Sequence, residues 1–381
     1  MKVTRTARLA SLATMGALAL TACGSGNNTS TSPAGGGGAS NNPAGGASSS
    51  GGGGAAAAAY CAKGSLSAQG STFQQNAELQ WSKDYAAACS GGQISYQGTG
   101  SGAGKTAFGN GTADFGGTDS LPKPEEQAAA DKTCSGGKGI VTPIVAGAVI
   151  LTYNLSGVDK LVLSPKTAAG IFQGTIKTWN DPAIKAENAS AKLPGIPIVA
   201  IHRSEKSGTT KIFSGWLDKT AGGAWKLGVD ETLTWPGGQS AKGSDGTTTA
   251  VSQAKGGITY TELSFAKQRS LPFADIMNAS GKAVTASGDS VSAALKTAKV
   301  DTAAGDIRIS PDYGTTTADA YPLAAPSYVL TCNKGNKNAG LLKGYLTYVL
   351  TDGKGVLDKL GYAPLPDEIA SKAAAQVSAL S

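Results

Sequence analysis

Residues 203–210 carry the chemical groups that hold an oxyanion. They read Arg-Ser-Glu-Lys-Ser-Gly-Thr-Thr, and an apolar run at helical spacing follows. We predict that Ser207, Gly208 and Thr209 form the first turn of a helix, whose free backbone N–H groups point at an anion. Arg203 adds a planar guanidinium suited to phosphate or carboxylate, and Glu205 is placed to orient it. The alternative is a capped surface helix with a solvated charge cluster.

Two more segments place similar donors after predicted strands. Gly70-Ser71-Thr72-Phe73 follows a strand predicted over 65–69 and opens a helix over 73–88. Gly98-Thr99-Gly100-Ser101-Gly102 follows a strand predicted over 93–97 and precedes a helix from about residue 103. Parallel strands end at one edge of a sheet, where ligands of α/β proteins bind. Each segment alone also fits an ordinary glycine-rich turn, but their repetition favours a site.

The segment 113–120 adds two carboxylates, Asp114 and Asp119. A carboxylate beside an anion site accepts a hydrogen bond from an oxyanion that still carries a proton. Phosphate near neutral pH has such a proton and sulfate has none, so Asp119 is the predicted selectivity element. The alternative is a turn or helix cap, a role for which Asp114 is the better candidate.

Several reaction types are excluded by the residues that are missing. Residues 98–106 end in Gly-Lys-Thr, but a nucleotide-binding P-loop requires glycine at position 99, where the chain has Thr99. His202 is the single histidine, and no carboxylates have metal-ligand spacing. We therefore expect no enzymatic activity, no metal and no cofactor. The modest positive charge, without basic runs, also argues against a nucleic-acid partner.

The first residues resemble an export signal. Lys2, Arg5 and Arg8 precede an apolar stretch over 9–20, and Leu-Thr-Ala then leads to Cys23. This pattern predicts a signal peptide over 1–22 and a lipobox, with cleavage before Cys23 and acylation of that cysteine. The alternative is a cleaved signal with an unmodified Cys23. The formal charge of +7 includes the three cations of this leader, so the processed chain would carry +4.

The composition changes again after Cys23. Gly, Ser, Ala, Asn, Thr and Pro fill the chain to residue 59, which predicts a disordered tether over 23–59. Four cysteines remain beyond it, Cys61, Cys89, Cys134 and Cys332, and an even number in an exported chain indicates two disulfides. Three pairings are possible, and we favour Cys61 with Cys89 and Cys134 with Cys332, because the first pair precedes two neighbouring predicted strands.

Alternating strands and helices predict an α/β fold with largely parallel sheets. The apolar runs at 140–154 and 321–331 are suited to cross between two domains. Two crossings would form domain I from 60–143 and 322–381 and domain II from 144–321, an arrangement that allows hinge closure. Helices predicted over 339–350 and 368–380 would pack back onto domain I.

Taken together, these segments resemble the phosphate-binding proteins that supply bacterial ABC phosphate importers. The resemblance covers 65–365 and includes Gln69 to Phe73, Tyr96 to Gly102, Asp114 to Asp119, Arg203 to Thr209 and Gly257 to Tyr260, with further family-like segments at 171–174, 179–182 and 243–246. It implies a two-domain periplasmic-binding-protein fold of type II that closes over phosphate. By motif position it implies that phosphate contacts Thr72, Phe73, Ser101, Asp119, Arg203, Ser207, Gly208 and Thr209, with Glu205 bracing Arg203.

Two positions depart from the family pattern. Gln74 stands where proline is common, and Glu205 stands where aspartate is common, which leaves its contact with Arg203 the weakest assignment. The resemblance implies a monomeric receptor on the outer face of the cytoplasmic membrane, with an ABC permease and its ATPase as partners. A receptor for sulfate or molybdate, or an envelope lipoprotein without a transport role, is the alternative.

Overall fold

The computed structural model describes residues 59–381. The predicted signal peptide, the lipidation site at Cys23 and the tether up to residue 58 lie outside this part of the chain. Within it, no helix has the length and apolar character needed to cross a membrane.

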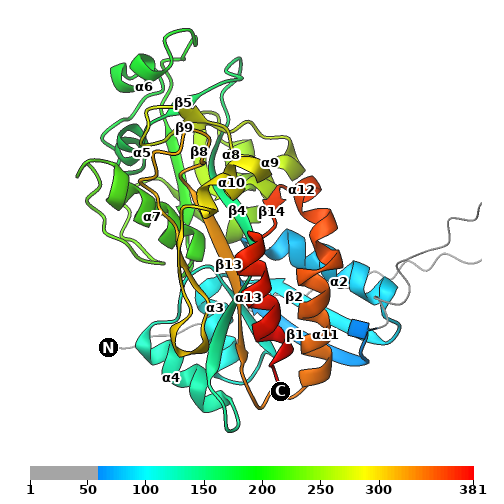
Figure 1. The fold of residues 1–381 in the computed structure, drawn as a ribbon. Helices are drawn as coiled ribbons and strands as arrows, with labels where there is room; N and C mark the ends of the chain where they lie inside the picture. Colours follow the sequence, from blue (N-terminus) through cyan, green and yellow to red (C-terminus); the bar gives the residue numbers. More distant parts are fainter. Residues whose placement is uncertain (1–58) are drawn as a thin grey trace, which may run out of the picture. The chain divides into compact units, whose positions relative to one another are not determined.

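A mixed β-sheet forms the centre of this structure (Figure 1). Its strands follow the spatial order β2-β1-β3-β13-β4-β8-β6-β7, with β14 paired to β4. The bounds are β1 (Gly64–Gly70), β2 (Gly92–Gly98), β3 (Phe115–Thr118), β4 (Gly139–Tyr153), β6 (Val199–Arg203), β7 (Gln239–Ala241), β8 (Gly257–Glu262), β13 (Ala324–Cys332) and β14 (Tyr362–Ala363). Five short strands lie apart from it: β5 (Val162–Leu163), β9 (Asp275–Met277), β10 (Ala283–Val284), β11 (Lys299–Asp301) and β12 (Arg308–Ser310).

Helices occupy most of the connections between these strands. They are α2 (Gln75–Ala88), α3 (Ser101–Gly109), α4 (Pro124–Thr133), α5 (Pro165–Phe172), α6 (Pro182–Glu187), α7 (Gly208–Thr220), α8 (Gly243–Gln253), α9 (Leu263–Arg269), α10 (Gly288–Leu295), α11 (Ala339–Leu350), α12 (Leu357–Leu360) and α13 (Asp367–Ser378). Short 3-10 turns occupy Ala303–Gly305 and Asp352–Val356.

The centre of the sheet is antiparallel, which corrects the expectation of largely parallel pairing. Strands β1, β2 and β3 are parallel to one another, and so are β6, β7 and β8. However, β13 runs antiparallel to both β3 and β4, and β4 runs antiparallel to β8. The two apolar runs that we expected to cross between domains form β4 and β13. Each of these strands runs antiparallel to the strands on both sides of it.

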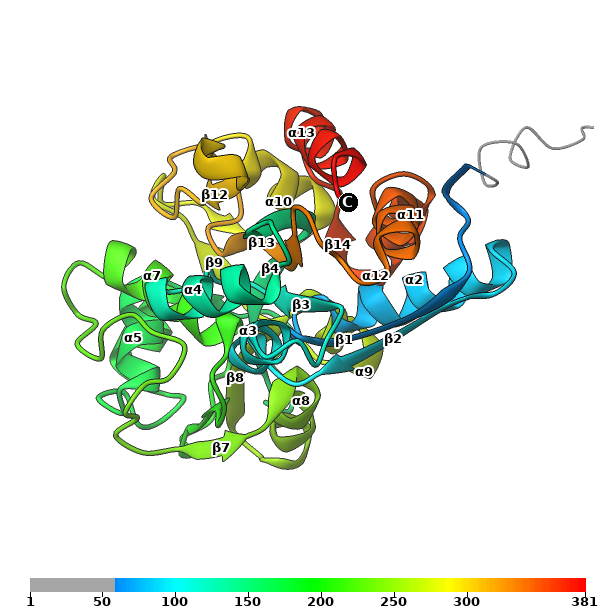
Figure 2. The ribbon, with the colours of Figure 1, turned by 90° about the horizontal axis from the view of Figure 1, so that it is seen from below.

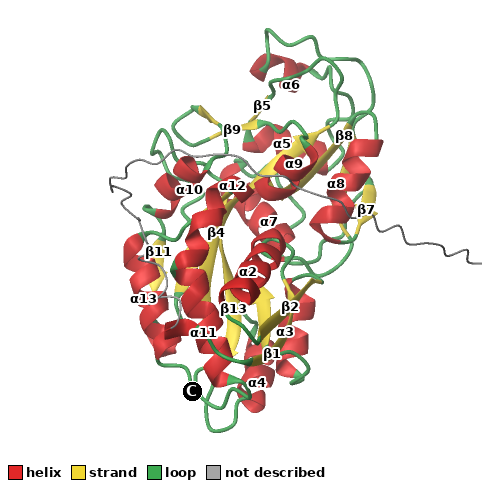
Figure 3. Cartoon of the chain, turned by 90° about the vertical axis from the view of Figure 1, so that its right-hand side faces the viewer, coloured by secondary structure: helices red, strands yellow, loops and turns green. Residues whose placement is uncertain are grey.

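Strand β4 joins two groups of strands (Figure 3). Its first part, from Gly139 to Ala148, pairs with β13, and its last part, from Val149 to Tyr153, pairs with β8. All fifteen of its residues are buried, which explains why the run is apolar without alternation. The chain on one side of β4 comes from residues 64–118 and 324–332, and on the other side from 199–262.

Side chains on the two faces of β13 and β4 pack into separate cores. Val141, Tyr328 and Leu330 pack with Phe108 of α3, while Ile140 and Val329 belong to the larger core that includes α11. Figure 2 shows α11 and α13 on one side of these strands and α3 on the other. Alternation along buried strands therefore places helices on both faces of the sheet.

Two disulfides join segments that are distant in sequence. Cys61 is bonded to Cys89, and Cys134 is bonded to Cys332. This is the pairing favoured from the sequence. The first bond joins the chain before β1 to the end of α2, and the second joins the end of α4 to the end of β13.

Candidate functional site

The turn after β1 places three hydroxyl and amide groups at the end of that strand. Ser71 donates a hydrogen bond from Oγ to Asp119 Oδ1 (2.5 Å) and accepts one from the Phe73 N–H (2.9 Å). The Thr72 Oγ1 lies 2.7 Å from Ser244 Oγ, at the start of α8. The side chains of Ser71, Thr72, Phe73 and Ser244 are all buried. Packing and hydrogen bonds therefore fix the conformation of this turn without a ligand.

Asp119 is the centre of a hydroxyl cluster. It follows β3 and is 8% exposed. Besides Ser71, it accepts hydrogen bonds from Ser101 Oγ (3.0 Å to Oδ2) and Ser327 Oγ (2.5 Å to Oδ1), and its own N–H donates to Ser101 Oγ (3.1 Å). Burial raises the pKa of Asp119 to about 6; the hydrogen bonds from Ser327, Ser71 and Ser101 act to lower this pKa, and the nearby Glu262 carboxylate acts to raise it.

The predicted helix start at residues 207–209 is present in the structure. Helix α7 begins at Gly208, and Ser207 is its N-cap, with Oγ accepting a hydrogen bond from the Thr210 N–H (3.2 Å). The cap satisfies one of the free amides of the first turn and leaves others directed outward along the helix axis. Positive helix-dipole charge at this end favours an anion.

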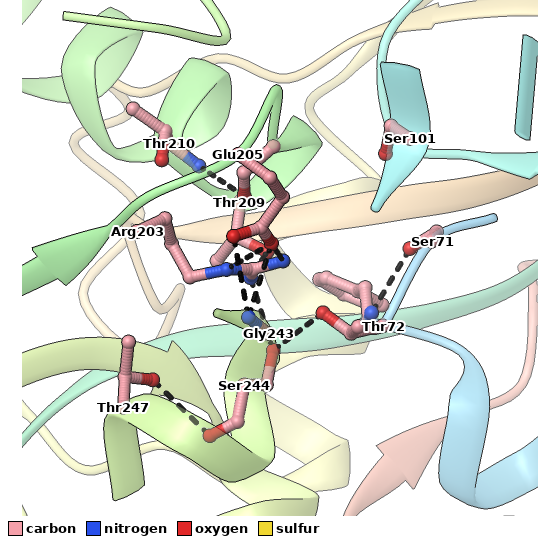
Figure 4. Close-up of polar contacts among 12 residues, drawn as sticks. Ser71, Thr72, Ser101, Arg203, Glu205, Thr209, Thr210, Gly243, Ser244 and Thr247 are labelled. Atoms are coloured by element: carbon pink, nitrogen blue, oxygen red, sulfur yellow. Dashed lines mark hydrogen bonds and ion pairs between the residues drawn. The ribbon is translucent and has the colours of Figure 1, made fainter. Parts of the chain in front are cut away.

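Arg203 ends β6 and is 4% exposed. Its Nε donates to Glu205 Oε1 (2.7 Å), and its Nη2 forms an ion pair with the same oxygen. Its Nη1 donates to Thr209 Oγ1 and Ser244 Oγ, both at 3.1 Å. Figure 4 shows these contacts together with the two hydrogen bonds from the Gly243 N–H to the Glu205 carboxylate. Glu205 therefore reaches Arg203 in this structure.

The aromatic core beneath α7 holds both Arg203 and the helix. Tyr260 on β8 stacks on Phe213 of α7, with ring centroids 4.5 Å apart. The Tyr260 hydroxyl accepts a hydrogen bond from the Arg203 N–H (3.1 Å) and lies 2.7 Å from Thr210 Oγ1. One buried ring therefore positions the arginine and the first turn of the helix together.

The start of α3 and Asp119 lie against residues 205–208, at the start of α7. A Cβ added to Gly208 would overlap Ser101 Oγ and the Asp119 carboxylate. Gly100 has a φ of +99° and a virtual Cβ 2.9 Å from both Glu205 Cγ and the Lys206 carbonyl oxygen, while the Gly102 N–H donates to that carbonyl (3.2 Å). Glycine at 100 and 208 is required because any side chain would block the approach of α3 to α7.

The structure brings together the residues that the resemblance implied as phosphate contacts, with Glu205: Thr72, Phe73, Ser101, Asp119, Arg203, Glu205, Ser207, Gly208 and Thr209. Asp114, the alternative cap, lies elsewhere and accepts hydrogen bonds from the Ser67 N–H and Asn338 Nδ2. Sequence reasoning missed Ser71, Ser244, Ser327 and Glu262. Ser71 and Ser244 stood inside the quoted motifs, each after a glycine at a helix start, and that position was the available signal. Ser327 lies within an apolar strand and offers no such signal. Glu262 accepts a hydrogen bond from Thr209 Oγ1 (2.6 Å), and its Oε2 has no hydrogen-bond partner within residues 59–381.

The chemistry of the site is that of binding an oxyanion. The single histidine, His202, stacks on Trp235 (centroids 4.8 Å apart), and burial lowers its pKa despite the contact with the Arg203 carbonyl. Among the described residues, no group of three or more His, Cys, Asp or Glu is arranged to hold a metal ion. Buried hydroxyls, one arginine and helix-start amides supply donors, and Asp119 supplies an acceptor.

Comparison with known proteins defines the class. A family model described as a PBP superfamily domain matches residues 55–353. The chain is 36% identical to the phosphate-binding protein PstS 3 of Mycobacterium leprae, over 84% of this chain and 87% of that one. It is 35% identical to PstS 2 of Mycobacterium tuberculosis over the full length of both. The solved structure of the periplasmic phosphate-binding protein PfluDING has a TM-score of 0.68 at 23% identity, covering 82% of this chain and 93% of that one, and so shares the two-domain fold.

The chain belongs to the PstS phosphate-binding proteins, a family of binding proteins rather than enzymes.

Proposed function

We propose that this protein is a lipid-anchored receptor that binds inorganic phosphate and delivers it to an ABC permease for import. One observation carries the phosphate assignment: the buried carboxylate of Asp119 lies directly opposite the first turn of α7. Donors alone would accept many oxyanions. An acceptor fixed among them suits an anion that still has a proton, and the PstS relatives carry the name of phosphate-binding proteins.

In this proposal, two sets of residues bind the anion. Ser101, Asp119, Thr72 and the Phe73 N–H act from one side. Arg203, Ser207, Gly208 and Thr209 act from the other, with Glu205 bracing Arg203. The hydroxyls that now contact each other, such as Thr72 with Ser244, rotate their protons toward the ligand. The ligand is gripped by many directed hydrogen bonds with only one arginine, so binding depends on geometry more than on net charge.

We infer that the receptor works by closing two domains, 60–143 with 322–381 and 144–321, around the anion. The support is the path of the chain. Within residues 59–381, the backbone passes from the first group of strands to the second through β4 and returns between β8 and β13, and the proposed ligand residues come from both groups. Strands that cross between domains serve as hinges because small backbone changes there rotate whole domains.

The decisive experiment is calorimetric titration with phosphate and then with sulfate. We expect phosphate to bind and sulfate not to bind at neutral pH. An Asp119→Asn variant should lose at least ~100-fold in selectivity, because its amide donates where the carboxylate accepts. Wild-type protein should also gain sulfate affinity as the pH falls below about 6, where Asp119 takes up a proton and becomes a donor.

Asp114→Asn is the matched control, since it removes the same charge from the same segment. Asp114 accepts hydrogen bonds from the Ser67 N–H (2.8 Å) and Asn338 Nδ2 (3.1 Å), away from the proposed ligand residues. Its selectivity should stay within twofold of the wild type. Equal binding of both anions by the wild type, or no binding of phosphate, would overturn the proposal.

We also propose an extracytoplasmic location, with acylated Cys23 anchoring the chain at the outer face of the membrane and the predicted segment 23–59 acting as a tether. The support is the signal and lipobox pattern of the sequence. The permease and its ATPase follow from the family as partners, and the receptor acts as a monomer.

A further inference from the structure

Lys105 is a buried cation to which the proposed ligand contacts assign no role. It lies on α3, in the Gly-Lys-Thr sequence at 104–106 that lacks the spacing of a nucleotide-binding loop, and it is 2% exposed. Its Nζ donates to Glu231 Oε1 (2.7 Å) and Ser120 Oγ (3.1 Å), and it pairs with Glu126 Oε2 (2.9 Å). A lysine buried to this degree is uncommon unless it is paired, and here the pairing is complete.

Glu231 reaches Lys105 from the segment between α7 and β7. It is 3% exposed, and its Oε1 also accepts a hydrogen bond from Ser120 Oγ. Its backbone carbonyl accepts a hydrogen bond from the N–H of Ser207 (3.0 Å), the N-cap of α7. Glu231 thus connects two places: its side chain holds Lys105 and Ser120, next to Asp119, and its backbone holds the start of α7.

We propose that Lys105 is a positioning residue for phosphate: its buried ion pair with Glu231 holds the first turn of α7 against Ser101 and Asp119 in the closed protein. This inference rests on the proposed function and on the two-domain closure described with it. Lys105 comes from the predicted domain I and Glu231 from the predicted domain II. No contact between Lys105 and the ligand is required, because the pair acts through Ser207.

The cost of leaving a buried charge unpaired explains why loss of the Lys105–Glu231 pair would weaken phosphate binding. Removing Lys105 leaves the Glu231 carboxylate uncompensated in a buried place, which is costly, whereas in an open form the carboxylate is hydrated. The closed form is therefore penalised more than the open form. A ligand that binds the closed form then loses apparent affinity in proportion to the lost closed population.

The test measures phosphate affinity by calorimetry and dissociation by stopped-flow tryptophan fluorescence. Lys105→Met should bind phosphate at least tenfold more weakly, mainly through faster dissociation. The double variant Lys105→Met/Glu231→Gln should recover most of the loss, because the deeply buried Glu231 charge is removed together with its partner. Glu126 loses Lys105 in both variants, but it is partly exposed and keeps its hydrogen bond from the Lys123 N–H. Recovery by a second substitution distinguishes positioning from simple damage to α3.

Asp230→Asn is the matched control. Asp230 is the neighbour of Glu231 and pairs with Lys123 (3.2 Å), the N-cap of α4. The Lys123 and Asp230 side chains are 46% and 45% exposed, so solvent screens this pair. Its affinity should stay within twofold of the wild type. Glu231→Gln decides the question if Lys105→Met fails to fold, and it should weaken binding at least threefold.

Wild-type phosphate affinity in Lys105→Met would overturn the inference, and so would a double variant that binds phosphate no better than Lys105→Met. If Lys105→Met does not fold, wild-type phosphate affinity in Glu231→Gln would overturn it. If the wild-type protein itself does not bind phosphate, the proposed function fails instead. The two failures are therefore separable in one series of titrations.

Discussion

At the scale of single residues, Asp119 shows how a carboxylate is kept in a buried oxyanion site. Three serine hydroxyls donate to it, from Ser71, Ser101 and Ser327. These bonds offset part of the cost of burying its charge and also fix the direction of its free lone pairs. The acceptor is thus oriented before ligand arrives, which limits the entropy lost on binding.

Glu78 on α2 is another buried carboxyl, not among the proposed ligand residues, and its pKa has a consequence for stability. Burial raises the pKa of Glu78 to about 8, although the hydrogen bond from Tyr345 (2.6 Å) acts to lower it. The folded protein therefore keeps a proton that the unfolded chain releases near its ordinary pKa of 4.5. Stability from this group is complete below about pH 4.5 and is lost as the pH rises toward 8.

We predict that the free energy of unfolding falls across this interval, by on the order of 1 kcal/mol per pH unit. Glu78→Gln should remove most of this slope, because an amide does not titrate. Chemical denaturation at pH 5, 6.5, 8 and 9 measures both proteins. Equal slopes in the two would show that Glu78 does not keep its proton, since Asp119 contributes the same background to each.

At the scale of elements, helix starts supply much of the proposed site. Helices α3, α7 and α8 begin at Ser101, Gly208 and Gly243, beside the carboxyl ends of β2, β6 and β7. Each start leaves backbone amides free, and glycine lets the segments approach closely. Strand direction explains the convergence, because β6 and β7 are parallel and end at the same edge.

The cap of α7 gives a prediction at this scale. Ser207→Ala removes the side-chain acceptor for the Thr210 N–H and should cost about 1 kcal/mol of stability. It should also weaken phosphate binding, because the same hydroxyl is a proposed ligand contact. Thermal unfolding and calorimetry measure the two effects.

Ser287→Ala is the control for the cap. Ser287 caps α10 in the same way, accepting from the Ser290 N–H (3.1 Å), and takes no part in the proposed site. It should lower stability by a similar amount with phosphate affinity unchanged. Unchanged phosphate affinity in Ser207→Ala would contradict the ligand role of that hydroxyl.

At the scale of the whole molecule, we propose that the lipid on Cys23 holds the folded phosphate-binding part of the chain at a membrane. A Cys23→Ser variant should move from the membrane fraction to the soluble fraction of exporting cells, because a single cysteine carries the predicted lipid. Ser25→Ala should remain with the membranes. Membrane retention of Cys23→Ser would contradict the anchor while leaving phosphate binding untouched.

Much of this protein could be predicted from its sequence, because many of its signals are local. The strand over 140–154 and the helix over 339–350 follow from apolar patterning, and the start of α7 follows from Ser207 and Gly208. The antiparallel centre of the sheet was not predictable in this way, since the directions of β8 and β13 against β4 depend on how the chain returns to the sheet after long connections.

The primary structure alone shows which groups are available to the site: Arg203, Asp119 and the glycine-rich helix starts, whose chemistry does not depend on distant residues. Which partners those groups meet is set by the folded chain. Ser327 reaches Asp119 from 208 positions away, and Glu231 reaches Lys105 from 126 positions away. Such contacts arise when packed strands and helices bring remote segments within hydrogen-bond range, and no local pattern in the sequence encodes that distance.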